Sequence, residues 1–198
     1  MVKYIVGLIA LVIWLFVLHI LKKADLNFWR FLVGAMGMFV LLFVYVEPLL
    51  VEPLARLVAL IASLPGKIGS MYQAYYKYGT IFISSDVGAI TLQIDFECSG
   101  IIEIMAFISL LTFFKVYTVT ERITVGILGT IGIMLANALR ITVICVMIHF
   151  GGISCYYVAH TFVGRIVFYV LSVLLYFYVF TKPQIIKQKV GKFRYDNN

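Results

Sequence analysis

The sequence predicts an all-α membrane protein: a polytopic bundle of about five transmembrane helices, with an interfacial amphipathic helix and a small extracytoplasmic β-hairpin. Of the 198 residues, 63% are apolar and only 13% are charged, whereas soluble domains have about 45–50% apolar and about 25% charged residues. The mean hydropathy is +1.05. These values exclude a cytosolic enzyme, a disordered tail and a small disulfide scaffold. No polar linker divides the chain, so residues 1–198 are expected to form a single integral membrane domain.

Five apolar runs approach the length of about 20 residues that crosses a bilayer. They predict transmembrane helices at about 4–21, 31–46, 100–117, 124–150 and 162–180. The first run is too long for the apolar part of a signal peptide and lacks a cleavage site between small residues. We therefore expect it to be a span that is retained in the protein.

The segment 47–99 joins the second and third predicted spans and is expected to be extracytoplasmic. Its first part, 47–65, contains two Glu-Pro steps, and proline interrupts a continuing helix. Glu52 and Arg56 lie among leucines there, which favours an amphipathic helix in the membrane interface; a sixth span is the alternative. Two β-branched, partly alternating runs around 84–88 predict the hairpin.

The distribution of basic residues predicts the orientation of the bundle. Loops on the cytoplasmic side of membrane proteins are enriched in Lys and Arg. When the tail 181–198 is placed in the cytoplasm, the inner side collects ten of the 16 basic residues. These ten are Lys22, Lys23, Arg30, Lys115, Arg122, Lys182, Lys187, Lys189, Lys192 and Arg194. The net charge of +7 is thus explained by topology and lipid headgroups, and no nucleic-acid partner is expected.

This topology brings three candidate catalytic residues to one side of the membrane. Cys98 precedes the third predicted span, and His160 precedes the fifth. Arg140 lies 16 residues into the fourth, a rise of about 24 Å in a hydrocarbon core about 30 Å thick. A thiolate can attack an acyl group while an imidazole takes and returns the proton. A guanidinium nearby can lower the thiol pKa or stabilise an oxyanion.

The cysteines also allow other interpretations. Cys98 and Cys155 are both predicted outside the membrane and could form a disulfide. Together with His149 and His160 they offer zinc-type ligands, although their spacing is not that of a compact zinc site, and we expect no metal and no other cofactor. Cys145 is expected to be a small buried residue.

The arginines have structural alternatives as well. Arg140 could extend toward the headgroups or form an ion pair with Glu103 at the start of the third span. Asn137 lies three residues before Arg140 on the same helix face, where it could position Arg140 or bond to another helix. Arg165 is expected to reach the headgroups or pair with a glutamate.

Three motifs resemble the signatures of the exosortase/archaeosortase family. They are "DFECSGI" at 95–101, "NALRI" at 137–141 and "AHTFVGRIVF" at 159–168. The resemblance implies an integral membrane cysteine transpeptidase that processes C-terminal sorting signals of exported proteins. It also implies Cys98 as the nucleophile and Arg140 and His160 as its catalytic partners, with Asn137, Glu103 and Ser99 expected in support.

The function expected from these observations is that of a cysteine endopeptidase or transpeptidase in a prokaryotic cytoplasmic membrane, with its site on the extracytoplasmic side. Its substrates would be exported proteins that end in a recognition motif, a transmembrane helix and a basic tail, and its other contacts would be membrane lipids. The alternatives are a small-molecule transporter or channel subunit and a non-catalytic subunit of a cell-envelope assembly. No internal repeat of the kind common in transporters is present.

Overall fold

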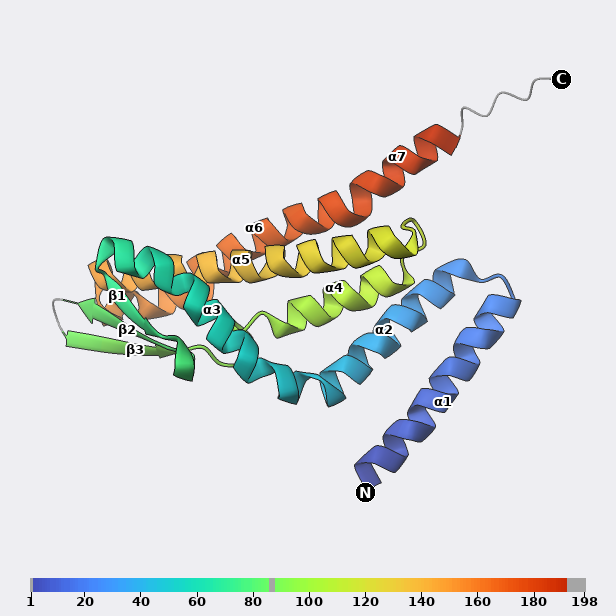
Figure 1. The fold of residues 1–198 in the computed structure, drawn as a ribbon, viewed down its shortest axis with the longest axis horizontal. Helices are drawn as coiled ribbons and strands as arrows, with labels where there is room; N and C mark the ends of the chain where they lie inside the picture. Colours follow the sequence, from blue (N-terminus) through green and yellow to red (C-terminus); the bar gives the residue numbers. More distant parts are fainter. Residues whose placement is uncertain (1, 86–87, 192–198) are drawn as a thin grey trace.

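The computed structural model describes residues 2–85 and 88–191 and confirms the all-α class, with one small sheet. The α-helices are α1 (Val2–Lys23), α2 (Asn27–Tyr45), α3 (Glu47–Gly69), α4 (Ile101–Phe113), α5 (Val119–Gly151), α6 (Gly164–Tyr176) and α7 (Lys182–Gly191). Figure 1 shows α4, α5 and α6 side by side, the sheet near one end of them, and α1 next to α2 at the edge of the bundle. Residues 192–198, the last part of the expected basic tail, lie outside the described residues.

The junction between α2 and α3 is where the first Glu-Pro step predicted a break. Helix α2 ends at Tyr45 and α3 begins at Glu47. Pro48 stands in the first turn of α3, where a missing backbone N–H costs nothing. The second Glu-Pro step does not end the helix, because Pro53 lies inside α3.

Helix α3 is longer than the expected segment 47–65. It continues to Gly69 and ends where Ser70 adopts a left-handed conformation, with φ of 52°. Its buried face is made mostly of small residues, among them Ala55, Ala59 and Ala62. These residues let the sheet and α5 approach closely. Helix α3 is also long and apolar enough to cross a membrane, as the alternative of a sixth span requires.

The predicted hairpin is present and is extended by a strand that was not expected. Strands β2 (Thr80–Ser85) and β3 (Gly88–Gln93) pair antiparallel, and β1 (Tyr72–Tyr75) adds to β2, giving the order β1-β2-β3. Strand β1 packs on α3, where the Tyr72 hydroxyl donates to the carbonyl of Ala62 at 2.7 Å. The His149 ring contacts the carbonyl of Ser84 and links α5 to β2.

The remaining helices follow the predicted spans with different ends. Helix α4 has 13 residues instead of the expected 100–117, whereas α5 has 33 and begins five residues before the expected 124–150. A capping box explains that earlier start: the Thr118 hydroxyl accepts from the N–H of Glu121, and the Glu121 carboxylate accepts from the N–H of Thr118.

The last predicted span, 162–180, is the middle of a longer helical region. This region starts with the short helix η3 (Ile153–Cys155) and includes two π-helical turns, η4 (Val158–Val163) and η5 (Phe177–Thr181). Part of the expected basic tail is therefore helical, in α7. Among the described residues, four helical segments are long and apolar enough to cross a membrane: α2, α3, α5 and residues 153–186.

Two apolar clusters form the core and meet on α5. One joins α3, the sheet and the later part of α5, with Val58, Ile81 and Ile144 fully buried. The other joins α4, α5 and α6 around Phe107 and Phe168. Between them, α5 carries two buried polar residues, Asn137 and Arg140 (0% and 5% exposed). Buried polar groups need partners, and the next subsection shows that both turn toward the loop that contains Cys98.

Candidate active site

The short helix η2 (Phe96–Cys98) holds Cys98 in a fixed backbone conformation. Asp95 caps this helix, and its carboxylate accepts from the Cys98 N–H at 3.2 Å. Gly100 follows with φ of 77°, a conformation that a side chain disfavours. A Cβ atom on Gly100 would also lie 3.3 Å from the amide nitrogen of Asn137. The Cys-Ser-Gly sequence therefore suits a tight turn against α5.

Asn137 fixes the other side of the Cys98 peptide. Its Nδ2 donates to the carbonyl of Cys98 at 2.6 Å. Both backbone polar groups of Cys98 are thus bonded, which leaves its side chain as the part that can react. Asn137 lies on the same helix as Arg140, and its partner is the cysteine loop.

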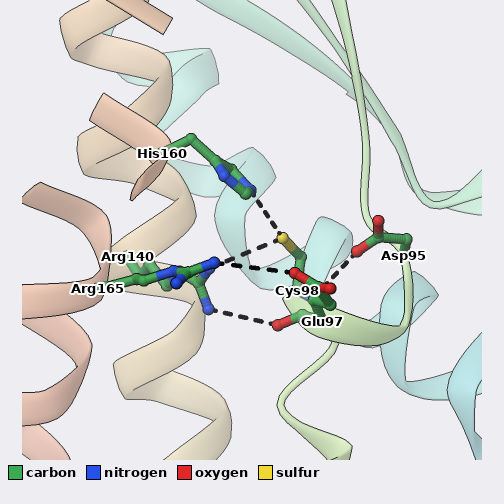
Figure 2. A network of polar contacts seen from close by, with 6 residues as sticks. All are labelled: Asp95, Glu97, Cys98, Arg140, His160 and Arg165. Carbon is green, nitrogen blue, oxygen red and sulfur yellow. Dashed lines mark hydrogen bonds and ion pairs between the residues drawn. The ribbon is translucent and has the colours of Figure 1, made fainter. Parts of the chain in front are cut away.

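His160 approaches the Cys98 sulfur from the π-helical turn η4. The distance from Sγ to Nε2 of His160 is 3.2 Å, within reach for proton transfer. On its other side the imidazole stacks on Tyr156, with ring centroids 5.6 Å apart and an interplanar angle of 10°. Figure 2 shows His160 and Arg140 directed at the same sulfur from different helical elements.

Arg140 reaches the sulfur from α5. Its Nη2 lies 3.8 Å from Cys98 Sγ, and its Nη1 donates to the carbonyl of Glu97 at 3.5 Å. The guanidinium carbon lies 5.9 Å from the ring centroid of Phe168, so an aromatic face supports the cation. Within the described residues, Nε of Arg140 is buried without a hydrogen-bond partner. The site thus contains a buried donor available to another group.

The electrostatic environment favours the protonated thiol. The pKa of Cys98 is raised to about 11, mainly by burial and to a lesser extent by the charges of Asp95 and Glu97, against the opposing effect of Arg140. At neutral pH the sulfur therefore carries its proton. Attack by this sulfur requires a base at the moment of reaction, and His160 is within reach to accept the proton.

An ion pair lies beside the sulfur, at the exposed rim of the site. Arg165 Nη2 and Glu97 Oε2 are 3.9 Å apart, and their side chains are 43% and 67% exposed. Of the two expectations for Arg165, contact with the headgroups or pairing with a glutamate, the structure shows the pairing. Such an exposed pair contributes little to stability.

Two of the expected supporting residues have other partners. The Ser99 hydroxyl donates to the carbonyl of Phe96 at 3.0 Å, so it stabilises the turn. The backbone carbonyl of Glu103 accepts from the Tyr176 hydroxyl at 3.4 Å. Between residues that the structure describes, no ion pair joins Glu103 to Arg140, because Arg140 turns toward the Cys98 loop instead.

The structure also bears on the two other interpretations of the cysteines, a disulfide between Cys98 and Cys155 and a zinc site. Cys98, Cys145 and Cys155 are all free, and Cys145 is fully buried as expected. Cys98 and Cys155 therefore do not form the disulfide. Within the described ranges, no group of three or more His, Cys, Asp or Glu side chains could hold a metal ion.

Asp95 and Phe168 belong to the site but were not expected there from the sequence. The signal for Asp95 was present in the sequence, because an aspartate three residues before a cysteine has the spacing of a side chain that caps a short helix. Phe168, which lies beneath the Arg140 cation, gave no comparable signal, since aromatic residues are frequent in this chain.

Comparison with models of known protein families gives a match for this chain. The family model described as transmembrane exosortase matches residues 2–177. The chain belongs to this family. The match covers all three sequence motifs and every helix from α1 to α6. As an exosortase, the chain is a multi-pass membrane protein with a general role in protein sorting. No match was found among curated proteins or among solved structures.

Proposed function

We propose that this exosortase is a cysteine endopeptidase or transpeptidase that cleaves C-terminal sorting signals of exported proteins through a thioester on Cys98. The observation that carries the proposal is the convergence of His160 and Arg140 on one buried sulfur, at 3.2 Å and 3.8 Å. A structural cysteine needs neither a base nor a cation, as the buried Cys145 on α5 illustrates.

The first step forms a bond between Cys98 Sγ and the carbonyl carbon of the scissile peptide. The thiol proton passes to Nε2 of His160 as the sulfur attacks. The carbonyl oxygen becomes an oxyanion, and the Arg140 guanidinium, which has a donor free, is suited to stabilise it. His160 then gives the proton to the leaving amine, and the C–N bond breaks to leave a thioester.

The second step releases the product. An amine or a water molecule attacks the thioester and gives up a proton to His160, which returns it to the sulfur as the C–S bond breaks. Cys98 is regenerated as a thiol. The incoming group decides whether the outcome is transpeptidation or hydrolysis.

The free edge of β3 is a suitable place for the substrate segment before the cleaved bond. Strand β3 lies at the edge of the sheet, and its last residue, Gln93, is only five residues before Cys98. The N–H of Ile94 donates to Gly79, so by alternation the backbone of Ala89, Thr91 and Gln93 is directed away from β2. An extended peptide can add to such an edge as a further strand.

The proposed substrate is an exported protein held in the membrane by a C-terminal apolar helix followed by a basic tail. The site would lie on the extracytoplasmic side of a prokaryotic cytoplasmic membrane. Support comes from the distribution of basic residues, which gather at the end of the bundle opposite to the sheet.

The test compares membrane proteins of the native host carrying the parental chain, Cys98→Ala or Cys155→Ala. In the Cys98→Ala strain we expect one or more exported proteins to retain a C-terminal apolar helix that is missing in the other two strains, as measured by mass spectrometry of C-terminal peptides. The Cys155→Ala strain is the matched control, because Cys155 lies at the same end of the molecule and no base or cation bonds to its sulfur among the described residues. Identical C-terminal peptides in all three strains, with the Cys98→Ala protein present in the membrane, would refute the enzyme and favour a non-catalytic assembly subunit.

A further inference from the structure

A large cavity lies at the opposite end of α4 from Cys98. It has a volume of about 1160 Å³ and is lined by the start of α2, the end of α4 and the region from α6 to α7. Sites for small ligands usually measure about 300–1,000 Å³. The cavity therefore has room for a ligand larger than most metabolites, and the mechanism proposed for Cys98 makes no use of it.

The cavity combines largely apolar walls with a few basic side chains. The walls are largely aromatic, with Phe31, Phe113 and Phe177 among the lining residues. The charged lining residues are Arg30, Lys115 and Arg122, and no acidic side chain is among the described residues that line the cavity. A ligand that matches this lining has a long apolar part and an anionic group.

The hydrogen bonds of the cationic side chains leave capacity for such a group. Arg122 uses Nη2 to bond the carbonyls of Phe114 and Tyr117, whereas its Nε is buried without a partner among the described residues. Lys115 donates to the side-chain oxygen of Asn27, which leaves further N–H groups on the ammonium. The hydroxyl of Ser172, another lining residue, is likewise buried and unpartnered within the described ranges.

We propose that this cavity binds an anionic phospholipid, with its acyl chains along the aromatic wall and its phosphate against Arg30, Lys115 and Arg122. Basic pockets between transmembrane helices are known to hold anionic headgroups. Charge complementarity selects this occupant, since three cations without a lining carboxylate favour a net negative lipid over a zwitterionic one. The lipid would join α2 to α4 and α6 at a place where protein packing leaves space.

The experiment is native mass spectrometry of the purified full chain, titrated with phosphatidylglycerol and with phosphatidylcholine of the same acyl chains. We expect one phosphatidylglycerol to bind at least about tenfold more tightly than phosphatidylcholine. Arg30→Gln/Lys115→Gln should weaken phosphatidylglycerol binding about 30-fold, since each basic residue near a membrane surface is worth about 1 kcal/mol. Arg122 is retained in this variant because it also holds the turn between α4 and α5.

The control variant is Lys22→Gln/Lys23→Gln, which removes the same charge at the end of α1, outside the lining of the cavity. It should bind phosphatidylglycerol like the parent. Equal weakening by both double variants, or equal affinity for the two lipids, would refute a specific site. Inorganic phosphate should not compete; displacement of the lipid by millimolar phosphate would show a plain anion site and overturn the proposal as well.

Discussion

Cys98 is held on every side by groups from different parts of the chain. Its N–H is bonded to Asp95, its carbonyl to Asn137, and its sulfur contacts His160 and Arg140. Such constraint is costly to build in an apolar protein, because each polar group must be taken out of water or lipid. The cost is understandable where a sulfur must meet a carbonyl carbon in one geometry, since small misplacements lower reaction rates strongly.

The first prediction at this scale concerns the shape of the Arg140 cation. Arg140→Lys keeps the charge but loses the planar fork that bonds the Glu97 carbonyl and the sulfur together. We expect this variant to insert normally and to process substrate at least about 100-fold more slowly, since the loss of one oxyanion donor costs about 10²–10³ in rate. The measurement is the processing rate of a substrate identified by the comparison of C-terminal peptides.

Arg165→Lys is the matched control for Arg140→Lys. Its partner Glu97 and its own side chain are exposed, so a change within a few-fold is expected. Parental rates in both lysine variants would exclude a catalytic role for Arg140. Equal losses in both would show that the effect is not specific to Arg140, since each lysine variant keeps the positive charge.

The second prediction concerns the protonation of Cys98. Burial raises the pKa of this thiol to about 11. Its thiolate fraction should therefore increase about tenfold per pH unit from pH 7 to pH 10. The thiolate fraction of an ordinary thiol, with a pKa of about 8.5, levels off within this range. The rate of alkylation by iodoacetamide, followed in Cys145→Ala/Cys155→Ala with glutathione as reference, measures this. A plateau below pH 8 would mean that His160 and Arg140 already hold a thiolate, contrary to the prediction.

At the level of single residues, sequence motifs could predict the members of the site but not all of their contacts. Cys98, Arg140 and His160 were expected together because topology brings them to one side of the membrane. The partners of Asn137 and Glu103 were not predictable, since they depend on how α4 and α5 are rotated about their axes. That rotation is decided by packing of the two core clusters, which hydropathy does not encode.

The structural elements were predicted best where a proline or an alternation of residues marks them, whereas the capping box that starts α5 was missed. The start of α3 followed from a Glu-Pro step, and the hairpin from its alternation. Strand β1 was missed because four residues rich in tyrosine carry little alternation, and its pairing with β2 is stabilised by the contact of Tyr72 with α3. The early end of α4 was missed because three of the four residues 114–117 are aromatic or aliphatic, so that Lys115 alone did not mark the end of the span.

A prediction at this scale tests the free edge of β3. Thr91→Pro removes a backbone N–H that is directed away from β2, and proline is tolerated in edge strands. If a substrate segment pairs with this edge, the variant should have a kcat/KM between about twofold and tenfold lower, mainly through KM, because a single hydrogen bond contributes about 0.5–1.5 kcal/mol. Steady-state kinetics on the identified substrate measure both parameters.

Thr91→Val is the control for the edge, since it changes the side chain and retains the N–H. It should process substrate like the parent. Unchanged kinetics in a folded Thr91→Pro protein would show that the substrate does not use the edge of β3, and would leave the chemistry proposed for Cys98 untouched.

The whole molecule has two ends of different character (Figure 1). The sheet, Cys98 and His160 lie at one end of the bundle. The other end contains the turn between α1 and α2, the turn between α4 and α5, and α7, with Lys22, Lys23, Arg30, Lys115 and Arg122 at these turns. Residues predicted to share the cytoplasmic side are therefore gathered at one end of the structure. This unequal distribution of basic residues between the two ends agrees with the positive-inside rule.

The last prediction tests which end faces outward. Cys98 is only 3% exposed, so the half-buried Cys155 at the same end is the better reporter. In intact cells, a membrane-impermeant maleimide should label Cys155 in the Cys98→Ala/Cys145→Ala protein. It should not label Gln184→Cys on α7 in a chain whose three native cysteines are alanine, until the membrane is permeabilised. The reverse pattern, with position 184 labelled in intact cells and Cys155 only after permeabilisation, would place the sulfur of Cys98 on the cytoplasmic side. Exported proteins could not meet the site there, so that result would contradict the proposed substrates even if Cys98 proved to be reactive.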